Sequence, residues 1–131
     1  MNALELLQEN PDAANIIKQY YVDLMINSLD ESSLPENFKE FMREQGIDEE
    51  KVAQMMEANA RNVYDVLDEN GFVISIIYDV NFKKYSYYIN DDKHRVVVDT
   101  RKEADSGAVA AAICRLQEKI NPQPSAEVYE D

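Results

Sequence analysis

Cys114 and His94 are the one cysteine and the one histidine of the chain, and they are the first residues to consider for chemistry. A catalytic Cys–His pair needs the imidazole to activate the thiol. Cys114 falls inside a predicted helix beside its apolar stripe, where a thiol serves as a small buried hydrophobic group. His94 follows a predicted turn. The sequence therefore favours a structural thiol over a catalytic pair.

A second group with suitable chemistry is Asn90, Asp91, Asp92 and His94, whose oxygen and nitrogen atoms are possible ligands for a metal ion. The segment lacks the mid-loop glycine and the closing glutamate of an EF-hand. Asn and Asp are also the ordinary residues of a tight turn. We therefore interpret the segment as a turn and predict no metal site.

Motifs that hold nucleotides or build hydrolase sites are missing from the sequence. P-loop, GxGxxG, GxSxG and HExxH patterns do not occur. The three glycines, Gly46, Gly71 and Gly107, do not cluster into a phosphate cradle. We predict no catalytic residue, no cofactor and no enzymatic activity.

Four acidic residues share one face of a predicted helix over 49–70. At 100° per residue they fall within about 80° of one another, with Arg61 among them. They are Glu50, Glu57, Asp65 and Asp68. Such a face imitates the phosphates of DNA where it occupies the groove of a basic protein. The alternative is a solvated face that keeps the protein soluble, which the presence of Arg61 favours.

Tyrosines cluster on the predicted strands, at Tyr78, Tyr85, Tyr87 and Tyr88. Lysines and an arginine lie nearby in the sequence, and aromatic side chains on strands can stack on nucleic-acid bases. Tyrosine is also simply a good strand residue, and packing within the sheet is the favoured interpretation. Tyr85, Tyr87 and Tyr88 are retained as candidate contacts for a partner.

The charge of the chain is large and unevenly distributed. The 131 residues carry a formal net charge of −13. Residues 1–71 hold 16 acidic and 5 basic residues, whereas residues 72–120 hold 7 acidic and 8 basic residues. Direct binding to nucleic acid or to an anionic membrane is disfavoured, because both need surplus Lys and Arg. The single cysteine and the absence of a long apolar run favour a cytoplasmic protein.

The spacing of apolar residues predicts an α+β domain over 1–120. Helices are expected over about 2–8, 11–29, 34–45, 49–70 and 101–120, and strands over about 72–79, 84–90 and 94–99. Short connections make the three strands an antiparallel meander, on which the N-terminal helices pack and which the C-terminal helix follows. Residues 121–131 are predicted to form a disordered acidic tail.

The predicted helix over 11–29 has an unusually wide apolar face. Val22 and Ile26 extend the stripe that Tyr21 belongs to. Such a helix packs on two sides, either within the chain or against a second copy. Packing within the chain is favoured, and a homodimer through this helix is the alternative.

Two resemblances follow from these elements. The order helix, three antiparallel strands, helix over 48–120 is similar in topology to the double-stranded-RNA-binding domain. That family opens its last helix with a basic cluster; here Arg101 and Lys102 match, whereas Glu103 and Asp105 do not, so RNA binding is not carried over. Residues 72–120, ending in DTRKEADSGAVAAAICRLQEKI, also resemble small uncharacterised proteins of bacteriophages and prophages of gut bacteria. That resemblance implies a mobile-element origin and no particular activity.

Together these observations predict a small acidic, non-enzymatic protein-interaction module with a protein partner. The alternative is an acidic DNA mimic that inhibits a nucleic-acid-binding host defence protein.

Overall fold

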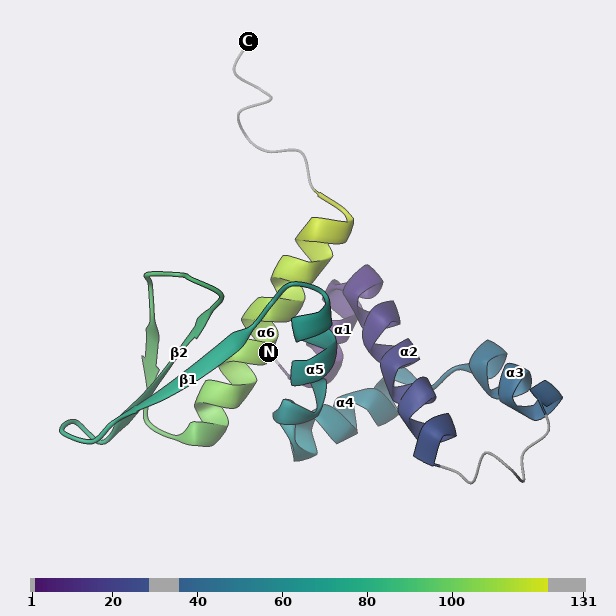
Figure 1. Cartoon of the computed structure of the whole chain (residues 1–131), viewed down its shortest axis with the longest axis horizontal. Coiled ribbons are helices and arrows are strands. Elements are labelled where there is room, and N and C mark those ends of the chain that lie inside the picture. Colours follow the sequence, from purple (N-terminus) through teal and green to yellow (C-terminus); the bar gives the residue numbers. More distant parts are fainter. Residues whose placement is uncertain (1, 29–35, 123–131) are drawn as a thin grey trace, which may run out of the picture.

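A computed structural model describes residues 2–28 and 36–122 (Figure 1). Its helices are α1 (Ala3–Glu9), α2 (Pro11–Ser28), α3 (Glu36–Gln45), α4 (Glu49–Ala58), the 3-10 helix η2 (Ala60–Val63), α5 (Tyr64–Glu69) and α6 (Arg101–Ile120). Its strands are β1 (Ile74–Asp79), β2 (Lys84–Ile89) and β3 (Val96–Val98). The α+β class, with N-terminal helices, an antiparallel sheet and a C-terminal helix, is confirmed. Among the described helices, none has the length and apolar character needed to cross a membrane.

Polar caps mark several of the helix ends that the sequence predicts. The side chain of Asp48 accepts a hydrogen bond from the Glu50 amide at 3.1 Å, and Thr100 Oγ1 accepts one from the Glu103 amide at 3.1 Å. Gly46 follows α3 with a φ of +68°, a backbone conformation that suits a residue without a Cβ. These local signals explain where α4 and α6 begin and where α3 ends.

The single helix predicted over 49–70 is wrong, because the structure divides this range into α4, η2 and α5. Asn59 lies at the break with an extended backbone, φ −157° and ψ 98°. Its side chain accepts a hydrogen bond from the Arg61 amide at 3.1 Å and so starts a new helix. Asparagine competes in this way with the continuing helical hydrogen bonds.

The first turn of α2 is capped from the other end of the chain. Gln117 Oε1 accepts hydrogen bonds from the amides of Asp12 and Ala13, at 2.8 and 3.0 Å. The side chain of Asn10, which could have capped α2, instead donates to the Leu6 carbonyl at the end of α1 at 2.8 Å. The cap thus also fastens α2 to α6.

The three strands form one antiparallel sheet in the order β1-β2-β3. Ile74 is paired with Ile89 and Asp79 with Lys84, so β1 and β2 match along their whole length. The third strand is shorter than the predicted range 94–99, because pairing with β2 begins only at Val96. The loop after β2 is the predicted turn, in which the Asp92 amide donates to the Ile89 carbonyl at 3.1 Å.

Helix α6 lies between the N-terminal helices and the sheet (Figure 1). Its buried side chains are Ala104, Asp105, Ala108, Val109, Ala112, Ile113 and Leu116. The hydrophobic core extends from these residues into α1, α2, α4, η2 and α5, and Ile89 joins it from the sheet. Ile120, in the last turn of α6, is 42% exposed. The N-terminal helices therefore meet the sheet mainly through α6.

The wide apolar face of α2 is largely used within the chain. Tyr21, Val22 and Ile26 are buried, whereas Leu24 and Met25 are exposed. The packing predicted for this face inside one chain is therefore present, and the homodimer remains a prediction. Asn121 and Pro122 apart, the predicted acidic tail lies outside the described residues.

Candidate functional site

The two faces of the sheet differ in what covers them. Side chains alternate along a strand, so Tyr87 and Ile89 lie on one face of β2 and Tyr88 on the other. The face of Tyr87 meets α6, where a Cβ added to Gly107 would lie 2.9 Å from the Tyr87 ring. Helix α6 contacts all three strands, and the side chains of Val73 and Val97 on the face of Tyr88 are exposed. We call this second face, together with the outer edge of β1 and the hairpin end at 80–83, the open side of the sheet.

The candidate tyrosines consequently do not form one patch. Tyr87 is a packing residue against α6. Tyr85 lies on the same face as Tyr87 and contacts Tyr78, with ring centroids 4.8 Å apart. Tyr88 lies on the open side, where the Arg95 guanidinium is 4.9 Å from its ring centroid. Of the three candidate tyrosines, Tyr88 is the one that the structure places on the open side.

The outer edge of β1 presents free backbone groups. The Asn90 amide donates to the Val73 carbonyl at 2.8 Å, so residues 73, 75, 77 and 79 are those whose backbone groups point towards β2. The alternate residues Ile74, Ile76 and Tyr78 therefore direct their N–H and C=O groups away from the sheet. Within the described residues no strand pairs with this edge.

The two edges of the sheet are protected to different degrees. Edge strands are usually blunted by charges, prolines or short length. On the β3 side the strand has three residues, with Arg95 before it and Asp99 after it. Asp99 also forms an ion pair with Lys84. The β1 side has none of these devices from residue 73 to residue 78, a segment that reads VISIIY.

Apolar side chains continue the open side to the hairpin end. Val80 and Phe82 are 73% and 75% exposed, and Figure 1 shows that this end of the hairpin extends away from the helices. On the open face Val73 and Val97 are also exposed. The turn itself is well formed, because Asp79 Oδ1 accepts hydrogen bonds from the amides of residues 81 and 82. A turn held by two hydrogen bonds thus presents exposed apolar groups.

The acidic candidates are exposed but are not aligned on one helix. Glu50 and Glu57 belong to α4, whereas Asp65 and Asp68 belong to α5 beyond the break at Asn59. The four would share one face in a continuous helix, but the break at Asn59 divides them between two helices. None of the four forms an ion pair with a described residue. Glu57 accepts a hydrogen bond from the Ala3 amide at 3.3 Å.

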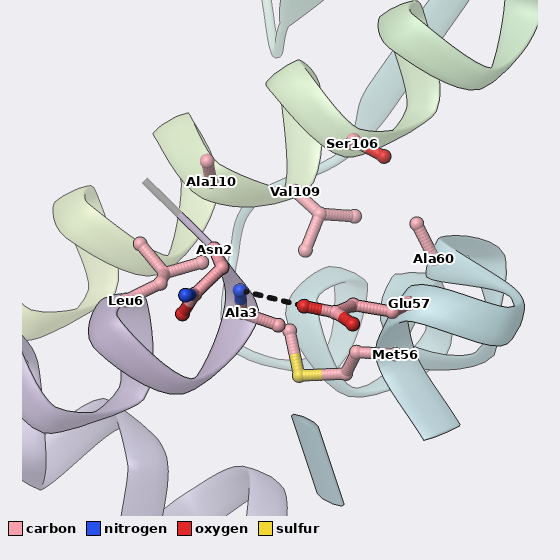
Figure 2. Close-up of a pocket in the computed structure, with 9 residues that line it drawn as sticks. All are labelled: Asn2, Ala3, Leu6, Met56, Glu57, Ala60, Ser106, Val109 and Ala110. Carbon is pink, nitrogen blue, oxygen red and sulfur yellow. Dashed lines mark hydrogen bonds between the residues drawn. The ribbon is translucent and has the colours of Figure 1, made fainter. Parts of the chain in front are cut away.

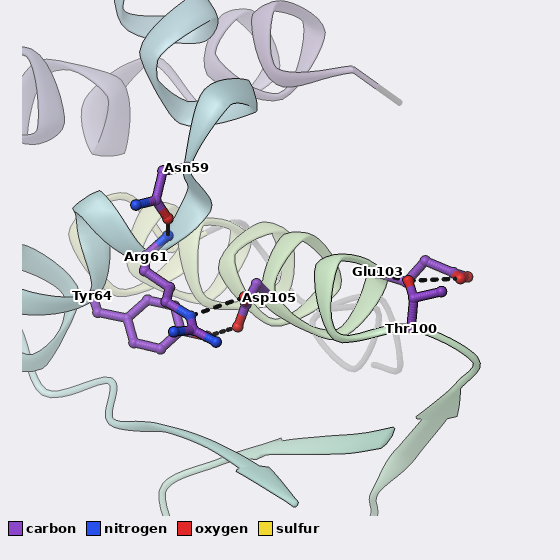
Figure 3. A network of polar contacts seen from close by, with 6 residues as sticks. All are labelled: Asn59, Arg61, Tyr64, Thr100, Glu103 and Asp105. Carbon is purple, nitrogen blue, oxygen red and sulfur yellow. Dashed lines mark hydrogen bonds and ion pairs between the residues drawn. The ribbon is translucent and has the colours of Figure 1, made fainter. Parts of the chain in front are cut away.

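Arg61 is paired with Asp105 and not with any of these four acidic residues. Its Nε donates to Asp105 Oδ2 at 3.0 Å, and the Tyr64 hydroxyl donates to Asp105 Oδ1 at 2.7 Å (Figure 3). Burial and the hydrogen bond to Asp105 raise the pKa of Tyr64 well above its usual range. This network ties η2 and α5 to α6. The sequence contained one signal for it, an acidic residue beside the apolar stripe of α6.

The remaining chemical candidates are not assembled into a site. Cys114 is exposed, so the prediction that it is buried is wrong; Ile113, the next residue back, takes the core position. No hydrogen bond joins the exposed His94 to Cys114 in the described part of the chain. Asp92 is paired with Arg115. Across residues 2–28 and 36–122 no group of three or more His, Cys, Asp or Glu side chains is arranged to hold a metal ion.

Comparisons of this chain with protein-family models, with curated proteins and with solved structures gave no match.

Proposed function

We propose that the chain is a small non-enzymatic protein-interaction module that binds its partner through the open side of the sheet. The observation that carries the proposal is the edge of β1, which is uncharged from residue 73 to residue 78, is unpaired within the described residues and lies beside exposed apolar side chains. A sheet edge of this kind binds an extended segment of another protein by adding it as a further strand. Backbone hydrogen bonds then supply affinity, and pockets for alternate side chains supply specificity.

The charge of the chain favours a different protein over a second copy as the partner. Each copy carries a formal net charge of −13, and two such chains repel one another. A segment with apolar residues in alternation and a net positive charge avoids this repulsion. We therefore expect an extended, basic and apolar segment at the edge of β1.

The experiment uses proline to block the edge without breaking the sheet. The N–H of Tyr78 points away from β2, so Tyr78→Pro removes a donor that only an added strand would use. Tyr78→Ala is the matched control, because it removes the same side chain and keeps the N–H. A partner is first recovered with the tagged wild-type chain from bacterial cells and its binding to both variants is measured by calorimetry.

We expect Tyr78→Pro to weaken binding by at least about tenfold relative to Tyr78→Ala, since each lost backbone hydrogen bond costs about 1 kcal/mol and the ring also blocks close approach. In the wild-type complex the amides of Ile76 and Tyr78 should exchange with deuterium more slowly than in the free chain. Equal binding by the two variants, with unchanged exchange at Ile76 and Tyr78, would refute binding at this edge.

A second candidate function is mimicry of DNA by the acidic helices. It is favoured by the exposure of Glu50, Glu57, Asp65 and Asp68 and by their lack of ion pairs with described residues. Changing the four to Gln or Asn should abolish binding of a basic partner, and binding by the wild-type chain should weaken steeply with salt. Survival of binding in the fourfold variant, together with its loss in Tyr78→Pro, would assign the function to the open side instead.

A further inference from the structure

We infer that a groove bounded by α1, the α4–η2 junction and α6 binds a small apolar carboxylate. The groove lies on the helical side of α6, away from the open side of the sheet, and it does not depend on the function proposed above. It consists of two recesses that share Glu57, Ala60 and Ser106 in their walls.

The first recess is mainly apolar and has a volume of about 180 Å³. Leu6 from α1, Met56 from α4 and Val109 from α6 supply its apolar wall (Figure 2). A dry cavity of about 150 Å³ lined by such side chains is large enough to bind benzene. The recess therefore suits an apolar body of the size of one ring or a short alkyl chain.

The second recess, of about 370 Å³, brings three cations together in a strongly acidic chain: Arg61, Arg101 and Lys102. Arg101 and Lys102 form no ion pair with any described residue. Arg61 is held by one bond to Asp105 and keeps further N–H donors. These groups provide the charge that an anionic head group needs.

The acidic groups in the same walls indicate how much negative charge the ligand carries. Asp105 is already engaged by Arg61 and Tyr64 (Figure 3), and Glu57 accepts the Ala3 amide at the α1 end of the groove (Figure 2). Three cations against two carboxylates leave the lining with one positive charge. A monoanion matches this balance, and arginine recognises a planar carboxylate particularly well. The adjoining apolar recess then takes the body of the molecule.

Three probes with the same apolar body and different head groups test the inference. They are 3-phenylpropionate, 3-phenylpropan-1-ol and 3-phenylpropylamine, titrated into the full chain at up to about 10 mM and followed by NMR chemical shifts, since fragments of this size bind with dissociation constants on the order of 1 mM. We expect the acid to bind about tenfold more tightly than the alcohol and the amine to bind most weakly. Shift changes should centre on the amides of Ala60, Ser106 and Ala110.

Two variants and a control locate the binding. Replacing Arg101 and Lys102 together by Gln should weaken binding of the acid about tenfold and leave binding of the alcohol unchanged. Lys93→Gln, which removes an exposed cation from the turn between β2 and β3, should change the affinity for neither the acid nor the alcohol. Ser106→Leu, at an exposed position in the shared wall, should abolish binding of both probes while the circular dichroism of the chain is preserved. Equal affinity for acid, alcohol and amine, unchanged binding in the double variant, or no shift with any probe would overturn the inference.

Discussion

The side of the sheet that α6 covers and the side that is left open contain the same kinds of residue with opposite consequences. On the covered side, Ile89 joins the core and Tyr87 packs against Gly107. On the open side, Val97 and Phe82 remain 64% and 75% exposed. Apolar side chains on the covered side contribute to the stability of the fold. Those on the open side contribute little to the stability of the fold, and they belong to the surface through which we propose that a partner binds.

The largest effect should come from removing a core residue on the covered side. Ile89→Ala deletes a side chain that is 2% exposed, so we expect it to lower the free energy of unfolding by about 3 kcal/mol. Tyr88→Ala, on the adjacent residue of the open side, should cost less than about 1 kcal/mol. Urea denaturation of both variants measures the contrast, and similar losses would remove the distinction between the two sides.

The next effect tests the polar contacts of α6 with η2 and α5. Tyr64→Phe removes the hydroxyl that donates to the buried Asp105. We expect it to lower the free energy of unfolding, measured by urea denaturation, by about 1–2 kcal/mol. No equivalent loss should follow Tyr78→Phe at the hairpin, since Tyr78 is 46% exposed and its hydroxyl forms no hydrogen bond with a described residue. A loss from Tyr78→Phe as large as that from Tyr64→Phe would show that the hairpin is held as firmly as α6.

The same network predicts how stability depends on alkaline pH. Tyrosines of the unfolded chain lose their protons near pH 10, whereas the raised pKa of Tyr64 keeps its proton on in the folded chain. The unfolded state then binds fewer protons, so stability should be intact below about pH 10 and should fall as the pH rises above it. Tyr20 and Tyr21, whose pKa values are raised mainly by burial, add to this fall. Above about pH 10 the free energy of unfolding should fall less steeply with pH in Tyr64→Phe than in the wild-type chain. An equally steep fall in both would contradict a role for Tyr64.

A smaller effect is expected where α6 lies closest to the sheet. Gly107→Ala gains about 1 kcal/mol of helix propensity. It also places a Cβ 2.9 Å from the Tyr87 ring, and such crowding costs about 1–3 kcal/mol. We expect a net loss of about 1 kcal/mol in the wild-type chain and a net gain in a Tyr87→Val background. A gain in both backgrounds would mean that the ring moves aside freely.

The smallest effect should be found on the open side itself. Arg95→Gln removes the guanidinium above the Tyr88 ring, a contact worth about 0.5–1 kcal/mol at an exposed site. We expect the free energy of unfolding, measured by thermal denaturation, to fall by about 0.5 kcal/mol. A loss above about 2 kcal/mol would show that Arg95 and Tyr88 are part of the scaffold.

The homodimer through α2 remains to be tested in solution. Because Tyr21, Val22 and Ile26 are buried within the chain, we expect light scattering to give a monomer. A dimer that is lost in a Leu24→Lys variant would instead assign the exposed part of α2 to self-association.

The amino-acid sequence by itself determined those features that depend on residues within a few positions of one another. The end of α3, the start of α4 and both ends of α6 agree with the predicted ranges. Side-chain capping, as by Asp48 and Thr100, and apolar periodicity act over a single helical turn. The change to alternating residues likewise located β1 and β2. The charge difference between the two halves is also a property of the sequence alone.

Only the tertiary structure decided which side of the sheet is covered and where the charged side chains are used. Gln117 caps α2 from more than a hundred residues away, and Arg61 turns from the acidic helix face to Asp105 on α6. Asn59 interrupts a pattern that would otherwise read as one helix. The break at Asn59 rests on a hydrogen bond from the amide two residues further on. The contacts of Gln117 and Arg61 instead join residues far apart in the sequence, and the periodicity of one segment carries no record of what packs against it. The open edge of β1 depends on tertiary structure for the same reason, because a strand is an edge only when no other strand is placed beside it.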